Sequence, residues 1–62
     1  MDELLHLPAK ERAKRYRQLA DDARREAAQA VSGGVRESYL SIAGQFDHLA
    51  LLADAEIMSG DG

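Results

Sequence analysis

The sequence contains no cysteine and no tryptophan, and it has one proline among its 62 residues. Without cysteine it can form neither disulfide bonds nor thiolate zinc sites, and it has no thiol nucleophile. Long apolar runs are also missing, because the longest, Leu49 to Ala53, is far shorter than the roughly 20 residues that span a bilayer. A chain of this length forms one small domain whose core barely offsets chain entropy. We therefore expect association to supply part of the stability.

The charge is unevenly spread along the chain. The net charge is −3, yet Lys10 to Arg25 holds seven basic and three acidic residues and is therefore +4. The remaining residues carry −7 in total. This division predicts two segments that face each other through ion pairs. The acidic start Met1-Asp2-Glu3 is unlike a basic secretory signal, so we expect a cytoplasmic protein.

Small apolar residues and one tyrosine recur between Pro8 and Val31 at alternating spacings of four and three residues. They are Ala9, Ala13, Tyr16, Ala20, Ala23, Ala27 and Ala30. This heptad pattern predicts a helix over residues 8–31 whose seam is almost all alanine. Alanine lets two helices approach closely but buries little area, so the seam alone contributes little stability.

The segment from Gly34 to Met58 carries more apolar surface than one partner helix can cover. One stripe at helical spacing predicts the face toward the first helix: Val35, Tyr39, Ile42, Phe46, Leu49 and Ala53, with Ala50 and Ile57 beside them. Leu40, Leu51 and Met58 lie roughly 120–140° away from Phe46 on the same helix. A second apolar face predicts a second partner.

The chain is expected to be a single antiparallel helical hairpin over residues 1–62. Residues 1–7 form a cap segment, 8–31 the first helix, 34–58 the second and 59–62 a tail. Gly33 suits the left-handed residue that ends a helix. In such a hairpin, opposite positions sum to about 65, which pairs Lys10 with Glu56, Arg12 with Asp54 and Arg17 with Asp47.

We expect two such all-α hairpins to form a homodimeric four-helix bundle. The dimer face, which is also the candidate surface for another protein, is predicted to use apolar residues of the second helix, with leucines of the cap segment closing one end. These residues are Leu40, Leu51, Leu52, Met58, Leu4, Leu5 and Leu7.

Catalytic and metal-binding chemistry is not indicated. His6 and His48 should lie far apart, and an isolated surface histidine is usually only solvated. Asp47, Asp54 and Glu56 face basic residues, as surface ion pairs do, rather than a pocket that would separate their pKa values. We expect no enzymatic activity, no metal and no cofactor.

Nucleic-acid binding by the first helix is the main alternative to protein binding. Its candidate contacts are Arg12, Lys14, Arg15 and Arg25. The cations of this helix do not share one face, and the acidic second helix partly cancels their field. Binding to a membrane surface is disfavoured because the apolar side of this helix is alanine. Protein binding remains the leading hypothesis.

The motifs Tyr16-Arg17-Gln18-Leu19-Ala20 and Val35-Arg36-Glu37-Ser38-Tyr39-Leu40, followed by Phe46-Asp47-His48-Leu49-Ala50, carry a resemblance. The chain resembles a group of small alphaproteobacterial proteins of uncharacterised role with the pattern YRxLA, a short break and RxxYLxxA. The resemblance covers about two-thirds of the chain. It implies a helical hairpin in a bacterial cell and carries over no catalytic residue and no partner.

Overall fold

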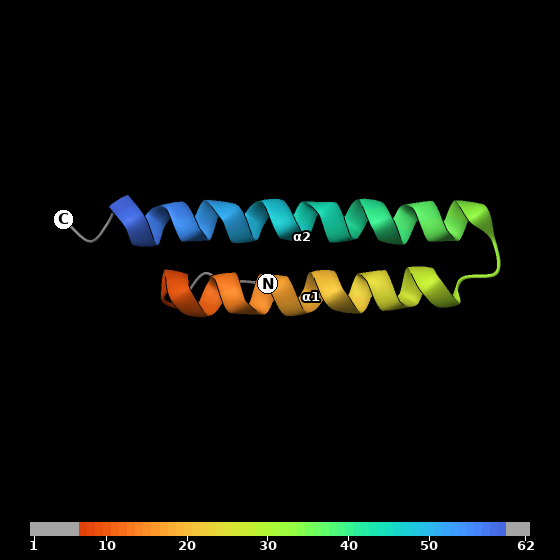
Figure 1. Cartoon of the computed structure of the whole chain (residues 1–62), viewed down its shortest axis with the longest axis horizontal. Coiled ribbons are helices and arrows are strands. Elements are labelled where there is room, and N and C mark those ends of the chain that lie inside the picture. The colour runs from red at the N-terminus through yellow and green to blue at the C-terminus, as the bar shows by residue number, and fades with distance from the viewer. Residues whose placement is uncertain (1–6, 60–62) are drawn as a thin grey trace.

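The computed structural model describes residues 7–59, which form two antiparallel helices (Figure 1). Helix α1 spans Ala9–Gln29 and helix α2 spans Gly33–Ser59. The two helices lie side by side and are joined by residues 30–32. No strand is present within residues 7–59, so the predicted all-helical hairpin is confirmed for the part of the chain that the structure describes. Leu4 and Leu5 of the expected cap segment lie outside it.

Helix α1 is slightly shorter than predicted at both ends. Pro8 precedes the first turn with extended backbone (φ −56°, ψ 154°), and its carbonyl accepts a hydrogen bond of 2.9 Å from the Arg12 N–H. At the other end, Ala30 turns to extended geometry (φ −68°, ψ 133°), so the helix ends at Gln29 rather than at Val31. Pro8 therefore acts as the residue before the helix, where its fixed φ is tolerated.

Helix α2 begins at a serine cap. The Ser32 hydroxyl accepts a hydrogen bond of 3.3 Å from the Val35 N–H, and the Ser32 carbonyl accepts one of 3.0 Å from the Arg36 N–H. The prediction that Gly33 ends the first helix in a left-handed conformation is wrong. Gly33 is already helical, and no residue between 7 and 59 has a positive φ. The extended Ala30 changes the chain direction, so no left-handed residue is needed.

The alanine seam of α1 is confirmed. Its central members are buried: Ala13, Tyr16, Ala20, Ala23 and Ala27. Ala9 and Ala30, at the two ends, are partly buried. The Tyr16 ring stacks on Phe46 of α2, with ring centroids 6.3 Å apart and planes inclined by 24°. Small residues thus bring the helices together, and the aromatic pair fills one of the wider places between them.

The core line of α2 matches the prediction in part, because Tyr39, Phe46, Ala50 and Ala53 lie in it as expected. Ala43, Ala50 and Ala53 are buried, and Tyr39 and Phe46 are partly buried against the cluster of Ala20, Ala23 and Ala43. Four of the predicted core residues are instead more than a third exposed: Val35, Ile42, Leu49 and Ile57. Close approach to an alanine seam leaves room only for small side chains opposite it. Ala43 and Ala50 therefore take the centre, and the larger residues move to the edge.

Candidate interaction surfaces

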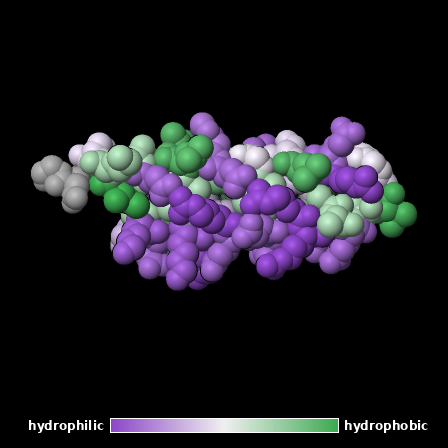
Figure 2. Space-filling view, in the orientation of Figure 1, coloured by the Kyte–Doolittle hydropathy of each residue, from purple (hydrophilic) through white to green (hydrophobic). Residues whose placement is uncertain are grey.

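Helix α2 exposes large apolar side chains that α1 does not cover. We call Leu40, Leu51, Leu52 and Met58 the outer apolar surface. Leu51 is 65% exposed and Met58 82% exposed. In Figure 2 the surface over α1 is almost wholly hydrophilic, whereas hydrophobic patches lie over α2. The part of the predicted interface that the structure describes on α2 is therefore accessible in the single chain.

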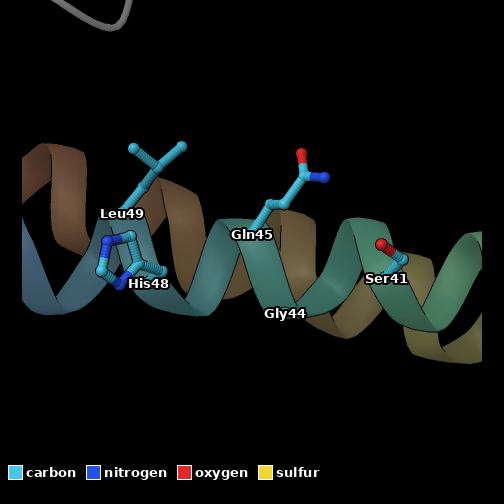
Figure 3. Close-up of a pocket in the computed structure, with 5 residues that line it drawn as sticks. All are labelled: Ser41, Gly44, Gln45, His48 and Leu49. Atoms are coloured by element: carbon cyan, nitrogen blue, oxygen red, sulfur yellow. The ribbon is translucent and has the colours of Figure 1, made fainter.

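A shallow groove runs along α2. It is lined by Ser41, Gly44, Gln45, His48 and Leu49, and in the close-up α1 lies behind α2, away from the groove (Figure 3). Gly44 lines the groove without a side chain, and a Cβ placed there would meet no neighbouring atom within 4 Å. All of the residues that line the groove belong to α2, and Leu49 is the one large apolar residue among them.

A second apolar surface lies along one edge of the helix–helix seam. Val35, Ile42 and Leu49 follow one another at seven-residue spacing on α2 and are 37–47% exposed. Glu56 continues this row by another seven residues. On α1 the row Arg12, Leu19, Glu26 has the same spacing, and Leu19 is partly buried. Seven residues are close to two helical turns, so each row keeps to one side of its helix.

Arg12 and Glu56 join these two rows at one end. The guanidinium donates two hydrogen bonds to the Glu56 carboxylate, of 2.9 and 2.7 Å, and its Nε donates to the Leu7 carbonyl at 3.2 Å. The Arg12 side chain is only 16% exposed. The contact places both rows on the same edge of the hairpin. We call this edge, with Leu19, Val35, Ile42 and Leu49, the apolar edge.

The opposite edge of the seam is charged. Arg17 pairs with Asp54, and Arg24 donates to Asp47 at 2.9 Å and to Asp21 at 2.6 Å. Arg17 and Arg24 are seven residues apart, as are Asp47 and Asp54, so the two pairs form parallel rows. Asp54 lies about 200° around α2 from Glu56. The hairpin therefore has one apolar edge and one edge closed by ion pairs, which we call the charged edge.

The predicted interhelical ion pairs are corrected by these contacts. Arg12 binds Glu56 instead of Asp54, and Arg17 binds Asp54 instead of Asp47. Lys10, predicted to pair with Glu56, has no salt bridge to that residue. Helical side chains lean toward the N-terminus of their own helix. In an antiparallel pair both partners lean, and the long arginine reaches further, so paired positions sum to more than 65.

The ion pairs shift the pKa values of their members. The hydrogen bond from Arg12 lowers the pKa of Glu56, and the same bond raises the pKa of Arg12. The pKa of Arg24 is raised by Asp21 and, in second place, by Asp47. All three groups therefore hold their charges more firmly than they would in an unfolded chain.

The four candidate nucleic-acid contacts do not form a single free cationic surface. Arg12 is held by Glu56, and Arg25 donates to Asp22 at 3.3 Å. Lys14 and Arg15 are exposed. Two of the four predicted cations thus already have a carboxylate partner within the hairpin.

Within residues 7–59, no group of three histidine and carboxylate side chains is placed to hold a metal ion. His48 lies in the shallow groove of α2, and His6 is outside the described residues. No helix in the described part of the chain is long and apolar enough to cross a membrane.

Comparisons of the chain with protein-family models, curated proteins and solved structures found no match. The resemblance to small alphaproteobacterial hairpin proteins accordingly stays a prediction based on the quoted motifs.

Proposed function

We propose that this protein is a non-enzymatic helical interaction protein that self-associates and binds a protein partner. The observation that carries the proposal is the apolar surface of α2, which α1 leaves uncovered on the outer apolar surface and along the apolar edge. Accessible apolar residues gathered in this way are typical of protein–protein contact sites. Leu7, the described member of the predicted cap contacts, is partly buried next to Arg12.

The energetics favour assembly through these apolar residues. Most of the buried residues in the hairpin are alanines, which contribute little area. Fully covering one leucine or isoleucine stabilises by about 1.5–3 kcal/mol. An exposed ion pair contributes at most about 1 kcal/mol. Covering several residues of α2 therefore outweighs the ion pairs, and a homodimeric four-helix bundle supplies the second layer that a single hairpin lacks.

The absence of enzymatic function is part of the same proposal. A general acid or base needs a carboxylate withdrawn from water with its pKa moved toward neutrality. Glu56 has a pKa that is moved the other way, by its bond to Arg12. Asp47 and Asp54 are occupied by Arg24 and Arg17. These carboxylates serve to hold the two helices together.

Sedimentation equilibrium of the full chain tests the self-association. The chain has a mass of 6.8 kDa, and we expect the measured mass to approach twice this value as concentration rises. A folded chain that keeps the monomer mass at every concentration would remove the self-association from the proposal. Circular dichroism on the same samples reports whether the chain is folded.

Partner binding is tested by comparing the native chain with a Leu51→Lys, Leu52→Lys double variant. Proteins recovered with the native chain from its source cells, and lost with the variant, would be bound through the outer apolar surface. Equal recovery by both chains would remove this surface from the proposal. Titration with duplex DNA at low and high salt tests the alternative, since binding that weakens steeply with salt would favour the nucleic-acid function.

A further inference from the structure

We infer that the apolar edge is the contact between two copies of this chain, with α1 of each copy lying over α2 of the other. This inference rests on the proposed self-association and adds the surface and the arrangement. It replaces the predicted dimer face on the outer apolar surface and leaves that surface free for a different protein. The juxtaposed rows that carry it are Arg12, Leu19, Glu26 on α1 and Val35, Ile42, Leu49, Glu56 on α2.

The apolar edge is continuous with the core of the hairpin. Leu49 follows the partly buried Phe46 by three residues, and Ile42 precedes it by four. Both therefore lie beside Phe46 on α2. Both helices contribute apolar residues here, since Leu19 lies on α1. A second two-helix layer placed on this edge would therefore share one core with the first, as four-helix bundles do.

The charged edge does not suit the same role. A second layer over it would have to bury the pairs Arg17–Asp54 and Arg24–Asp47. Removing paired charges from water costs about as much as their mutual attraction returns. The outer apolar surface is also unsuited to a four-helix core, because it belongs to α2 alone. Among the surfaces formed by residues 7–59, the apolar edge is the one to which both helices contribute large apolar side chains.

Charge complementarity decides how the two copies are oriented. Helix α1 holds seven basic and four acidic residues, a net charge of +3, and α2 holds one basic and four acidic residues, a net charge of −3. When α1 lies over α2 of the second copy, each helix has two neighbours of opposite charge. The other face-to-face arrangement, α1 over α1, would oppose like charges.

This arrangement fixes an approximate register. A two-fold axis parallel to the helices does not shift one copy along the other. The residue numbers that lie level between copies therefore have the same sum as those within one hairpin. Ala20, Ala23 and Ala43 cluster with Phe46, which corresponds to sums of about 66. Leu19 of one copy is then level with residue 47 of the other. On the apolar edge its nearest apolar neighbours there are Ile42 and Leu49.

Sedimentation of two matched variants tests the inference. Ile42→Glu is expected to weaken the dimer on the order of a hundredfold or more, because a charge would enter the shared core. Leu51→Glu, on the outer apolar surface, is expected to change dimerisation by less than about threefold. Dissociation by Leu51→Glu with a native-like dimer for Ile42→Glu would overturn the assignment of the edge. A native chain that is itself monomeric would instead overturn the proposed self-association.

Cross-linking keeps the test decisive if Ile42→Glu does not fold. The chain has no cysteine, so single cysteines can be placed at will. A mixture of Leu19→Cys and Leu49→Cys chains, treated with a short thiol-reactive linker, is expected to give the mixed dimer. A mixture of Leu19→Cys and Leu51→Cys chains is the control and is expected to give none. Efficient linkage of Leu19→Cys to itself, or linkage only in the control mixture, would overturn the arrangement.

Discussion

The two edges of the hairpin are built on the same plan and completed differently. On both edges, residues seven positions apart form a row on α1 beside a row on α2. The charged edge is closed within the chain by Arg17–Asp54 and Arg24–Asp47. The apolar edge has one such pair, Arg12–Glu56, at its end, and elsewhere it carries Leu19, Val35, Ile42 and Leu49, with the exposed Glu26 completing the α1 row. The charged edge is therefore closed by ion pairs within the chain, whereas the apolar edge leaves Val35, Ile42 and Leu49 more than a third exposed.

Both edges depend on the close packing of the two helices. The largest predicted change in stability therefore comes from a substitution that forces the helices apart. Ala20 is wholly buried in the seam. We expect Ala20→Leu to destabilise the hairpin by about 1–3 kcal/mol, because the added side chain has no space and must push the helices apart. Thermal and urea unfolding followed by circular dichroism measure the change.

The matched control for this variant is Ala28→Leu. Ala28 is exposed on the same helix, so the same added volume meets no neighbour, and a change within about 0.5 kcal/mol is expected. Equal stabilities of the two variants would show that the helices are not closely packed at Ala20. Neither the apolar edge nor the charged edge would then have its α1 row held against its α2 row.

The sequence was sufficient to predict the helices and the α1 seam, but only part of the α2 core line. The spacing of Ala13, Tyr16 and Ala20 identifies one stripe, because almost every other residue of α1 is polar. Helix α2 has apolar residues around most of its circumference, and the predicted stripe included Ile42 but not Ala43. The deciding constraint, that a small residue must face an alanine seam, is a property of the pair of helices and not of either helix alone.

The ion pairs show the same limit at finer scale. The segregation of charge correctly predicted that α1 and α2 would be linked by salt bridges. The predicted partners of Arg12 and Arg17 were wrong because a residue-number sum compares the heights of Cα atoms along the two helices. The guanidinium that makes the ion pair lies well away from its own Cα. Including the lean of both side chains toward their helix N-termini would have raised the expected sums and brought Arg17 to Asp54.

A smaller effect is expected at the end of the apolar edge where α2 begins. Val35, the first apolar residue of its row, donates its backbone N–H to the Ser32 hydroxyl. We expect Ser32→Ala to destabilise by about 1 kcal/mol through loss of this cap, and Ser32→Asp to retain most of the stability. Melting temperatures of the three chains measure this. Identical values for Ser32→Ala and the native chain would mean that the cap does not hold the start of α2.

The smallest predicted effect concerns Arg12–Glu56, the pair that ends the apolar edge. The pKa of Glu56 is lowered in the folded chain by the hydrogen bond from Arg12, so the folded state binds this proton less readily than the unfolded state. The stabilisation is therefore complete above the ordinary glutamate pKa of roughly 4.3 and is lost as the pH falls through the lowered value. Glu56→Gln should melt slightly below the native chain at neutral pH.

This difference in melting temperature should close as the pH falls through the lowered pKa of Glu56, below which Glu56 of the native chain is also neutral. The two chains differ only at residue 56, so comparing them removes the contribution of every other group. Arg12→Gln should reproduce the neutral-pH loss, and combining the two substitutions should add little to either, because each removes the same contact. A difference that persisted unchanged into acid would assign the effect of Glu56→Gln to packing. The Arg12–Glu56 ion pair would then contribute no measurable stability at that end of the apolar edge.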